Sequence, residues 1–210
     1  MATLGVSAGP EEALFEPSDW NPRGYFQRPD VTHFNKLLIE STGGSVSFPR
    51  DPETISAEVK SSVFGSIDLS WSECSPKFLV KDPRLCITLK TWLDHGMFGD
   101  AEIKLVRIRR ELESTAKSCL RHYDVREYCL NSIVHANAIL KFYNHWADWH
   151  CQTLGLPAAE IAFDDLVNNP EETITGLASF LGQSDAEMIK AAIEESALGR
   201  SRIKDDWYVA

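Results

Sequence analysis

An arginine and a serine eight positions apart, Arg110 and Ser118, stand where a short apolar run gives way to a helical pattern. The run 103–108 is typical of a buried strand, and 111–123 has helix formers, acids in its first turn and no Gly or Pro. A strand that leads into a helix presents free backbone N–H groups and the positive end of the helix dipole. The pair could therefore close on a phosphate. The alternative is that Arg110 is a surface cation and Ser118 a neutral helix residue.

A second pair of cations flanks an Asp-Pro turn in the segment Lys81-Asp82-Pro83-Arg84. An apolar run over 78–81 precedes the turn and is typical of a short strand. Ligands in open α/β sheets bind at the carboxyl ends of the strands, so Lys81 and Arg84 are well placed for an anion. The alternative is a solvated turn with ordinary charges beside it.

Six histidines are candidate bases. His33 lies near the start of a helix that follows a long loop, and His95 lies just after the helix that follows Arg84, so either could reach a cleft at the sheet edge. For each of them a structural role is the alternative. The other four fall in long helices rich in apolar and aromatic residues, where packing is the expected role. They are His122, His135, His145 and His150.

Helix and strand patterns alternate along the chain that must position these residues. Gly and Pro make residues 1–28 mostly loop, and 197–210 is a polar tail. We expect strands over 78–81, 103–108 and 159–163 and helices over 30–40, 53–63, 86–93, 111–123, 126–154, 169–182 and 184–196. This alternation predicts one α/β domain over 1–210 with a parallel sheet and helices on both faces. Three strands are few for such a sheet.

Composition limits the possible partners. The formal net charge of -10 argues against nonspecific nucleic-acid binding, which needs a basic surface, although an anionic small molecule can still bind where the local charge is positive. The five cysteines are an odd number without metal-ligand spacing, which predicts reduced thiols in a cytoplasmic protein and no metal site. No window has the length and hydropathy of a signal peptide or membrane span.

Four segments, taken in order, resemble the P-loop sulfotransferase family of bacterial type, which uses 3′-phosphoadenosine 5′-phosphosulfate (PAPS). Residues 21–27 (NPRGYFQ) are similar to the family's N-P-x-G-Y-F-E segment, and 80–84 (VKDPR) to its V-K-D-P-R segment. Arg110 and Ser118 match the pair that holds the 3′-phosphate. Residues 161–182 resemble the closing strand, the D-L loop and the F-L-G helix.

The resemblance implies roles for individual residues. Arg110 and Ser118 would bind the 3′-phosphate, Lys81 would lie near the phosphosulfate, and Arg202 in the basic tail would help to cover the nucleotide. The reaction would be in-line transfer of a sulfuryl group from PAPS to a hydroxyl or amine of a small-molecule or glycan acceptor. Catalysis would then rest on positioning and electrostatic stabilisation, as in phosphoryl transfer.

The chain departs from the family pattern at three places. Leu112 stands where the family usually has Pro, and Gln27 stands where relatives carry Glu. An amide cannot act as a general base, so that role would pass to another group such as His33. The largest departure is that no strand with a basic Gly/Ser/Thr-rich loop precedes 21–27, so the first strand of the sheet and the grip on the 5′-phosphosulfate are missing.

Two explanations of the missing loop lead to two functions. If Met1 is an internal methionine of a longer protein, the expected function is PAPS-dependent sulfuryl transfer. If the chain is a natural short form, it must repair its sheet by rearranging strands or by recruiting a partner chain, such as a second copy. It would then be a non-catalytic relative that binds a nucleotide or a partner protein through the remaining half-site. A P-loop kinase is a distant third hypothesis, because the Walker lysine and the Ser/Thr after it are absent.

Overall fold

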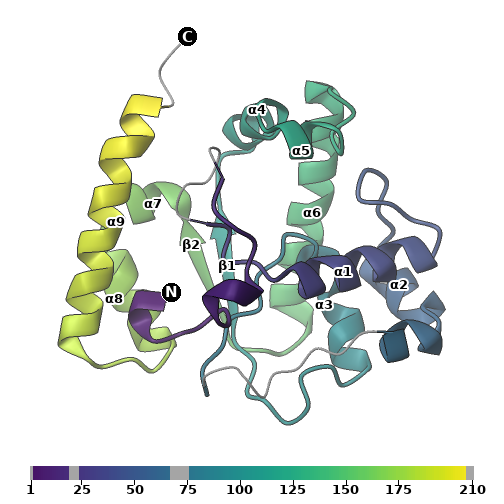
Figure 1. Cartoon of the computed structure of the whole chain (residues 1–210), viewed down its shortest axis with the longest axis horizontal. Coiled ribbons are helices and arrows are strands. Elements are labelled where there is room, and N and C mark those ends of the chain that lie inside the picture. The colour runs from purple at the N-terminus through teal and green to yellow at the C-terminus, as the bar shows by residue number, and fades with distance from the viewer. Residues whose placement is uncertain (1, 19–23, 67–75, 207–210) are drawn as a thin grey trace.

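A computed structural model describes residues 2–18, 24–66 and 76–206, apart from the side chains of residues 2, 123, 124 and 197–206. Helices flank a small parallel sheet, with α7, α8 and α9 on one side and α1 to α6 on the other (Figure 1). The elements in chain order are η1 (Ala2–Leu4), η2 (Glu11–Ala13), α1 (Pro29–Ser41), α2 (Pro52–Glu58), η3 (Ser61–Ser66), α3 (Leu85–Asp94), β1 (Leu105–Arg109), α4 (Leu112–Arg121), α5 (Tyr123–Arg126), α6 (Ile133–Thr153), β2 (Ala158–Ala162), α7 (Phe163–Asn168), α8 (Pro170–Phe180) and α9 (Ala186–Asp206), where η marks a 3-10 helix.

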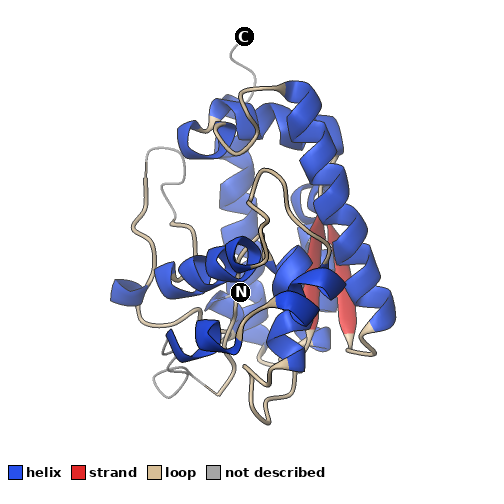
Figure 2. Cartoon of the chain, turned by 90° about the vertical axis from the view of Figure 1, so that its right-hand side faces the viewer, coloured by secondary structure: helices blue, strands red, loops and turns tan. Residues whose placement is uncertain are grey.

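The sheet consists of β1 and β2, which lie side by side in parallel (Figure 2). Their register runs from Leu105 opposite Ala158 to Arg109 opposite Ala162. The α/β class and the parallel pairing predicted from the sequence are confirmed. Because the two strands are parallel and in register, the residues that follow them, Arg110 and Phe163, leave the sheet at the same edge.

The predicted strand over 78–81 is wrong. Within the described residues, this segment makes one isolated parallel bridge, between Phe78 and Ser7. The Leu79 N–H donates to the Ser7 carbonyl at 2.7 Å. Gly5 and Gly9, with φ of 76° and 117°, turn the backbone away on either side of Ser7. The partner segment is therefore too short for a regular strand.

Several helix boundaries also differ from the prediction. The helix expected over 53–63 ends at Glu58 as α2, because Val59 has an extended backbone, and the separate 3-10 helix η3 follows it. The long helix expected over 126–154 begins at Ile133, because Leu130 and Asn131 adopt left-handed backbone angles (φ 51° and 52°) that a helix cannot contain. Ser132 then caps α6 by accepting the His135 N–H at 3.4 Å. At the other end of the chain, α9 continues through residues 197–206, which the sequence analysis had assigned to a polar tail.

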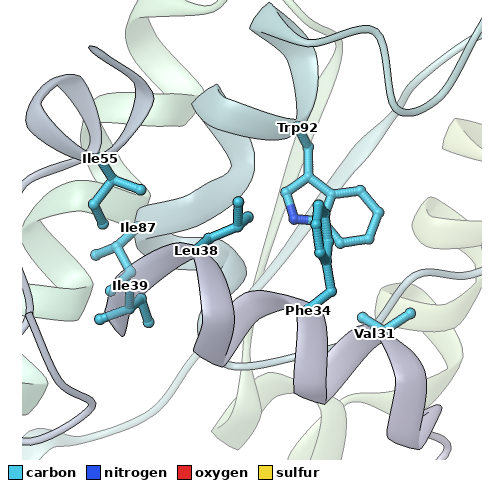
Figure 3. Close-up of a cluster of buried hydrophobic side chains, with 7 residues drawn as sticks. All are labelled: Val31, Phe34, Leu38, Ile39, Ile55, Ile87 and Trp92. Carbon is cyan, nitrogen blue, oxygen red and sulfur yellow. The ribbon is translucent and has the colours of Figure 1, made fainter. Parts of the chain in front are cut away.

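The largest buried cluster joins α1, α2 and α3. Phe34 on α1 and Trp92 on α3 pack edge to face with ring centroids 5.1 Å apart, and both are fully buried (Figure 3). Ile87, in the first turn of α3, is fully buried in the same cluster, so the cluster holds α1 and α3 and thereby the segments before them that carry Gln27 and Lys81. The full cluster is Val31, Phe34, Leu38, Ile39, Ile55, Ile87 and Trp92.

Smaller clusters join α8 to α9 and α4 to α6. None of the helices in the described ranges is long and apolar enough to cross a membrane. The described cysteines, which exclude Cys74, are all free thiols.

Candidate anion-binding site

Arg110 lies at the carboxyl edge of the sheet, directly after β1. Its guanidinium carbon is 4.8 Å from the ring centroid of Phe163, the residue directly after β2. The face of an aromatic ring attracts a cation through its quadrupole. The ring of Phe163 therefore orients Arg110 at the edge where the sequence places an anion.

Contrary to the expectation from the sequence, the backbone N–H groups at the N-terminus of α4 are not free to bind a phosphate. Glu111 is the N-cap, and its carboxylate accepts the N–H groups of Glu113 at 2.8 Å and Ser114 at 2.6 Å. The hydrogen bonds from Ser114, followed by that from Glu113, lower the pKa of Glu111 to about 2. These backbone donors are therefore occupied by a carboxylate, and a phosphate here must rely on side chains.

Ser118 lies in the second turn of α4 and is half-buried. Its carbonyl accepts the His122 N–H at 3.3 Å, whereas its hydroxyl has no hydrogen-bond partner in the described part of the chain. Burial raises the pKa of the adjacent Cys119 thiol, and the charge of Arg110 acts on that pKa in the opposite direction. Ser118 therefore offers a hydroxyl donor that no described residue uses.

Three cations of the basic segment 104–110 are engaged in ion pairs. Arg107 is buried and pairs with Asp148 on α6 and with Glu160 on β2, the latter at 3.1 Å. Arg109 pairs with Glu160 at 2.9 Å, and Lys104 pairs with a nearby acid at 3.4 Å. These contacts hold β1, β2 and α6 together.

Lys81 meets the segment that contains Gln27. Its ammonium donates to Oε1 of Gln27 at 3.0 Å and to the carbonyl of Tyr25 at 3.1 Å. Although part of the Lys81 side chain is exposed, desolvation of its ammonium lowers its pKa, against the opposing effect of Asp82. Both hydrogen bonds go to neutral oxygen atoms, so this charge is not neutralised by direct contact with a carboxylate.

Asp82 is the buried centre of the same cluster. It accepts hydrogen bonds from Gln27 at 3.0 Å, from Thr32 at 2.8 Å and from the backbone of Arg84 at 2.8 Å. It also forms an ion pair with the Arg84 guanidinium at 2.9 Å, in which the Asp82 side chain is fully buried. Arg84, a candidate cation at the sequence level, therefore has a structural role, and Lys81 remains the candidate for an anion.

The structure describes the side chains of two of the three remaining candidate residues, His33 and His95. His33 is exposed on α1, and its neighbour Thr32 makes the hydrogen bond to Asp82. The backbone of Arg202 belongs to α9, but its side chain is outside the described residues. His95, the other candidate base, stacks on Phe64 with ring centroids 4.1 Å apart.

The structure adds His122, whose sequence context predicts a packing role, to the residues near Lys81. His122, at the C-cap of α4, has its Nε2 3.3 Å from the hydroxyl of Tyr25, which is 2.7 Å from the hydroxyl of Ser18. Tyr25 therefore contacts Lys81 through its carbonyl and His122 through its hydroxyl. The place of Tyr25 within 21–27 is a signal for its importance, but nothing in the sequence pairs it with His122.

Comparisons of this chain with protein-family models, with curated proteins and with solved structures find no match. Across the described residues, no group of His, Cys, Asp and Glu side chains is arranged to hold a metal ion.

Proposed function

We propose that this chain is a protein of the sulfotransferase type, with a P-loop sulfotransferase fold. In this proposal Arg110 and Ser118 bind the 3′-phosphate of PAPS, and Lys81 faces the sulfuryl group. The observation that carries the proposal is the position of Tyr25, which contacts both Lys81 and His122 at the end of α4. Segments 21–27 and 80–84, which both resemble the sulfotransferase family, are thereby joined to the end of the helix that carries Ser118.

Each residue has a defined task. Arg110, oriented by Phe163, donates to the phosphate, and the Ser118 hydroxyl adds a donor from the next turns of α4. Lys81 can exchange its two neutral oxygen partners for an oxygen of the leaving phosphate, where a positive charge stabilises the developing negative charge. The cation and the phosphate-binding pair would thus act on opposite ends of the donor.

The transfer step is an in-line displacement at sulfur. The acceptor oxygen or nitrogen forms a bond to sulfur while the bond from sulfur to the bridging phosphate oxygen breaks, and adenosine 3′,5′-bisphosphate leaves. The acceptor loses one proton, for which His122 replaces His33 as the proposed base, because His122 is the histidine joined to the Lys81 cluster through Tyr25.

A second candidate function is binding without transfer. Its support is that Arg110 and Ser118 need only a 3′-phosphate, whereas transfer also requires Lys81 to give up its hydrogen bonds to Tyr25 and Gln27. The chain would then recognise a nucleotide or a partner through the 3′-phosphate half-site.

Calorimetry with adenosine 3′,5′-bisphosphate tests the half-site that both functions share. We expect the wild-type chain to bind this nucleotide more tightly than adenosine 5′-monophosphate. Arg110→Ala should weaken binding at least tenfold and Ser118→Ala about fivefold, in line with the loss of charged and neutral hydrogen bonds. Arg109→Ala is the matched control. It removes the same charge at the neighbouring position, from a side chain that pairs with Glu160. Absence of binding by the wild-type chain would contradict the proposal.

Transfer of radioactive sulfate from labelled PAPS to a panel of hydroxyl and amine acceptors separates the two functions. Sulfated product that disappears in Lys81→Gln supports the enzyme. Tight nucleotide binding without product from any acceptor supports the binding module.

A further inference from the structure

A cavity of about 900 Å³ opens beside the Lys81 cluster and has no role in the site described above. Its walls come from residues 5–17 of the N-terminal segment and from Gly24 and Phe26. This segment, purple in Figure 1, lies between the helices α8 and α9 on one side and α1 on the other. The volume is within the range of about 300–1,000 Å³ that is typical of small-molecule sites.

Aromatic rings form part of the wall. Phe15 and Phe26 both line the cavity and remain 39% and 43% exposed. Phe26 has a left-handed backbone (φ 49°), which costs free energy in a bulky residue. Exposed aromatic rings around a hollow offer a ligand apolar surface that water leaves on binding.

The cavity wall is connected by hydrogen bonds to Lys81, the residue proposed to face the sulfuryl group. The Phe15 N–H donates to the carbonyl of Gln27 at 2.9 Å, and the Gln27 side chain accepts from Lys81. The ring of Phe15 also meets the ring of Tyr25 edge to face, with centroids 6.5 Å apart. A ligand held between Phe15 and Phe26 would therefore lie next to the residues that hold Lys81.

The charged residues among the described lining of the cavity are all acidic. Glu11, Glu12 and Glu16 line it and are exposed, and none of them forms an ion pair within the described residues. The stem of Arg28 passes near Gly9, but its guanidinium pairs with Asp30 at 2.5 Å. The potential at this mouth therefore favours a cationic ligand and disfavours an anionic one.

We propose that this cavity binds an aromatic amine that carries a hydroxyl group, and that this amine is the acceptor of the sulfuryl group. The aromatic ring would pack on Phe15 and Phe26, and the ammonium would face the glutamates at the mouth. Binding of the amine is independent of the proposed function, whereas its role as acceptor rests on that function.

Two probes with the same ring and opposite charge test the binding. Tyramine carries an ammonium, and 4-hydroxyphenylacetate carries a carboxylate in its place. In calorimetry or ligand-detected NMR without nucleotide, we expect tyramine to bind at least tenfold more tightly than the anion. Phe15→Ala should weaken tyramine binding at least fivefold. Failure of tyramine to bind the wild-type chain, or equal binding of the two probes, would overturn the proposal.

The double variant Glu12→Gln/Glu16→Gln tests the charges. Exposed ion pairs contribute little individually, so we expect a total loss of about three- to tenfold in tyramine affinity. Glu53→Gln/Glu171→Gln is the matched control, because it removes two exposed carboxylates that do not line the cavity. An equal loss in both variants would contradict a local role for the glutamates.

Adenosine 3′,5′-bisphosphate binding keeps the two proposals separate. The Glu12→Gln/Glu16→Gln variant should bind the nucleotide as the wild type does, which also shows that it is folded. Tyramine binding without nucleotide binding would leave the cavity assigned and refute the proposed function. Nucleotide binding without tyramine binding would refute the cavity alone.

Discussion

The hydroxyl of Tyr25 lies 3.3 Å from Nε2 of His122, a residue 97 positions later in the chain. Their rings also meet edge to face, with centroids 6.4 Å apart. This pair connects the loop before α1 to the C-terminal end of α4, and the Tyr25 carbonyl extends the connection to Lys81. The two halves of the candidate site therefore have a common structural element.

Tyr25→Phe tests this connection, because it removes the hydroxyl and keeps the ring contacts. We expect the free energy of unfolding, measured in urea, to fall by about 1 kcal/mol, the usual contribution of a hydrogen bond. A double-mutant cycle with His122→Gln should show coupling of at least about 0.5 kcal/mol. Strictly additive effects of the two substitutions would mean that the pair makes no energetic contribution.

Asp82→Asn should be strongly destabilising. The substitution removes the charge that faces the Arg84 guanidinium in a pair that is largely buried. An unpaired buried charge costs about 3–5 kcal/mol. Asp94→Asn is the control, since its pair with Lys90 is partly exposed and worth at most about 1 kcal/mol. Similar losses in urea denaturation for the two variants would show that Asp82 is not the centre of a buried network.

Glu111→Gln should strengthen nucleotide binding. The Glu111 carboxylate occupies the N–H groups at the start of α4 and places a negative charge next to Arg110. We expect the affinity for adenosine 3′,5′-bisphosphate to rise about two- to fivefold, the range of an exposed charge interaction. Glu113→Gln, which removes a charge paired with Lys117, is the comparison. Weaker binding in Glu111→Gln would show that the capping geometry matters more than the charge.

His150 should make the fold sensitive to mild acid. Burial, with a smaller effect from Lys90, lowers the pKa of His150 to about 4, against 6.5 in the unfolded chain. Below pH 6.5 the unfolded state therefore binds a proton at His150 that the folded state does not bind. The free energy of unfolding falls until the pH reaches about 4. Between pH 7 and pH 5 this loss amounts to about 2 kcal/mol.

The measurement is urea denaturation of the wild type and of His150→Gln at both pH values. The variant has no titrating group at this position, so its stability should depend less on pH by that amount. Equal pH dependence of the two proteins would assign the acid sensitivity to other groups.

Local sequence patterns predicted the positions of secondary-structure elements correctly where a segment's own residues determine its structure. The apolar run before Arg110 forms β1 within two residues of the predicted bounds, and the Asn-Pro-Glu-Glu start of α8 lies where its sequence indicates. Glu111 shows the limit of such patterns, because a shift of one residue in a helix start turns a first-turn acid into the cap that fills the expected anion site.

The sequence by itself determined the α/β class, the parallel strands and the candidate residues Arg110, Ser118 and Lys81, because periodicity and turn chemistry are properties of neighbouring residues. The tertiary structure alone decided which cations stay available. Arg84 is neutralised by Asp82, whereas Lys81 meets neutral oxygen atoms. It also decided that His122, 97 residues later in the chain, contacts Tyr25. Such pairings depend on how distant segments pack, and no spacing along a single chain encodes them.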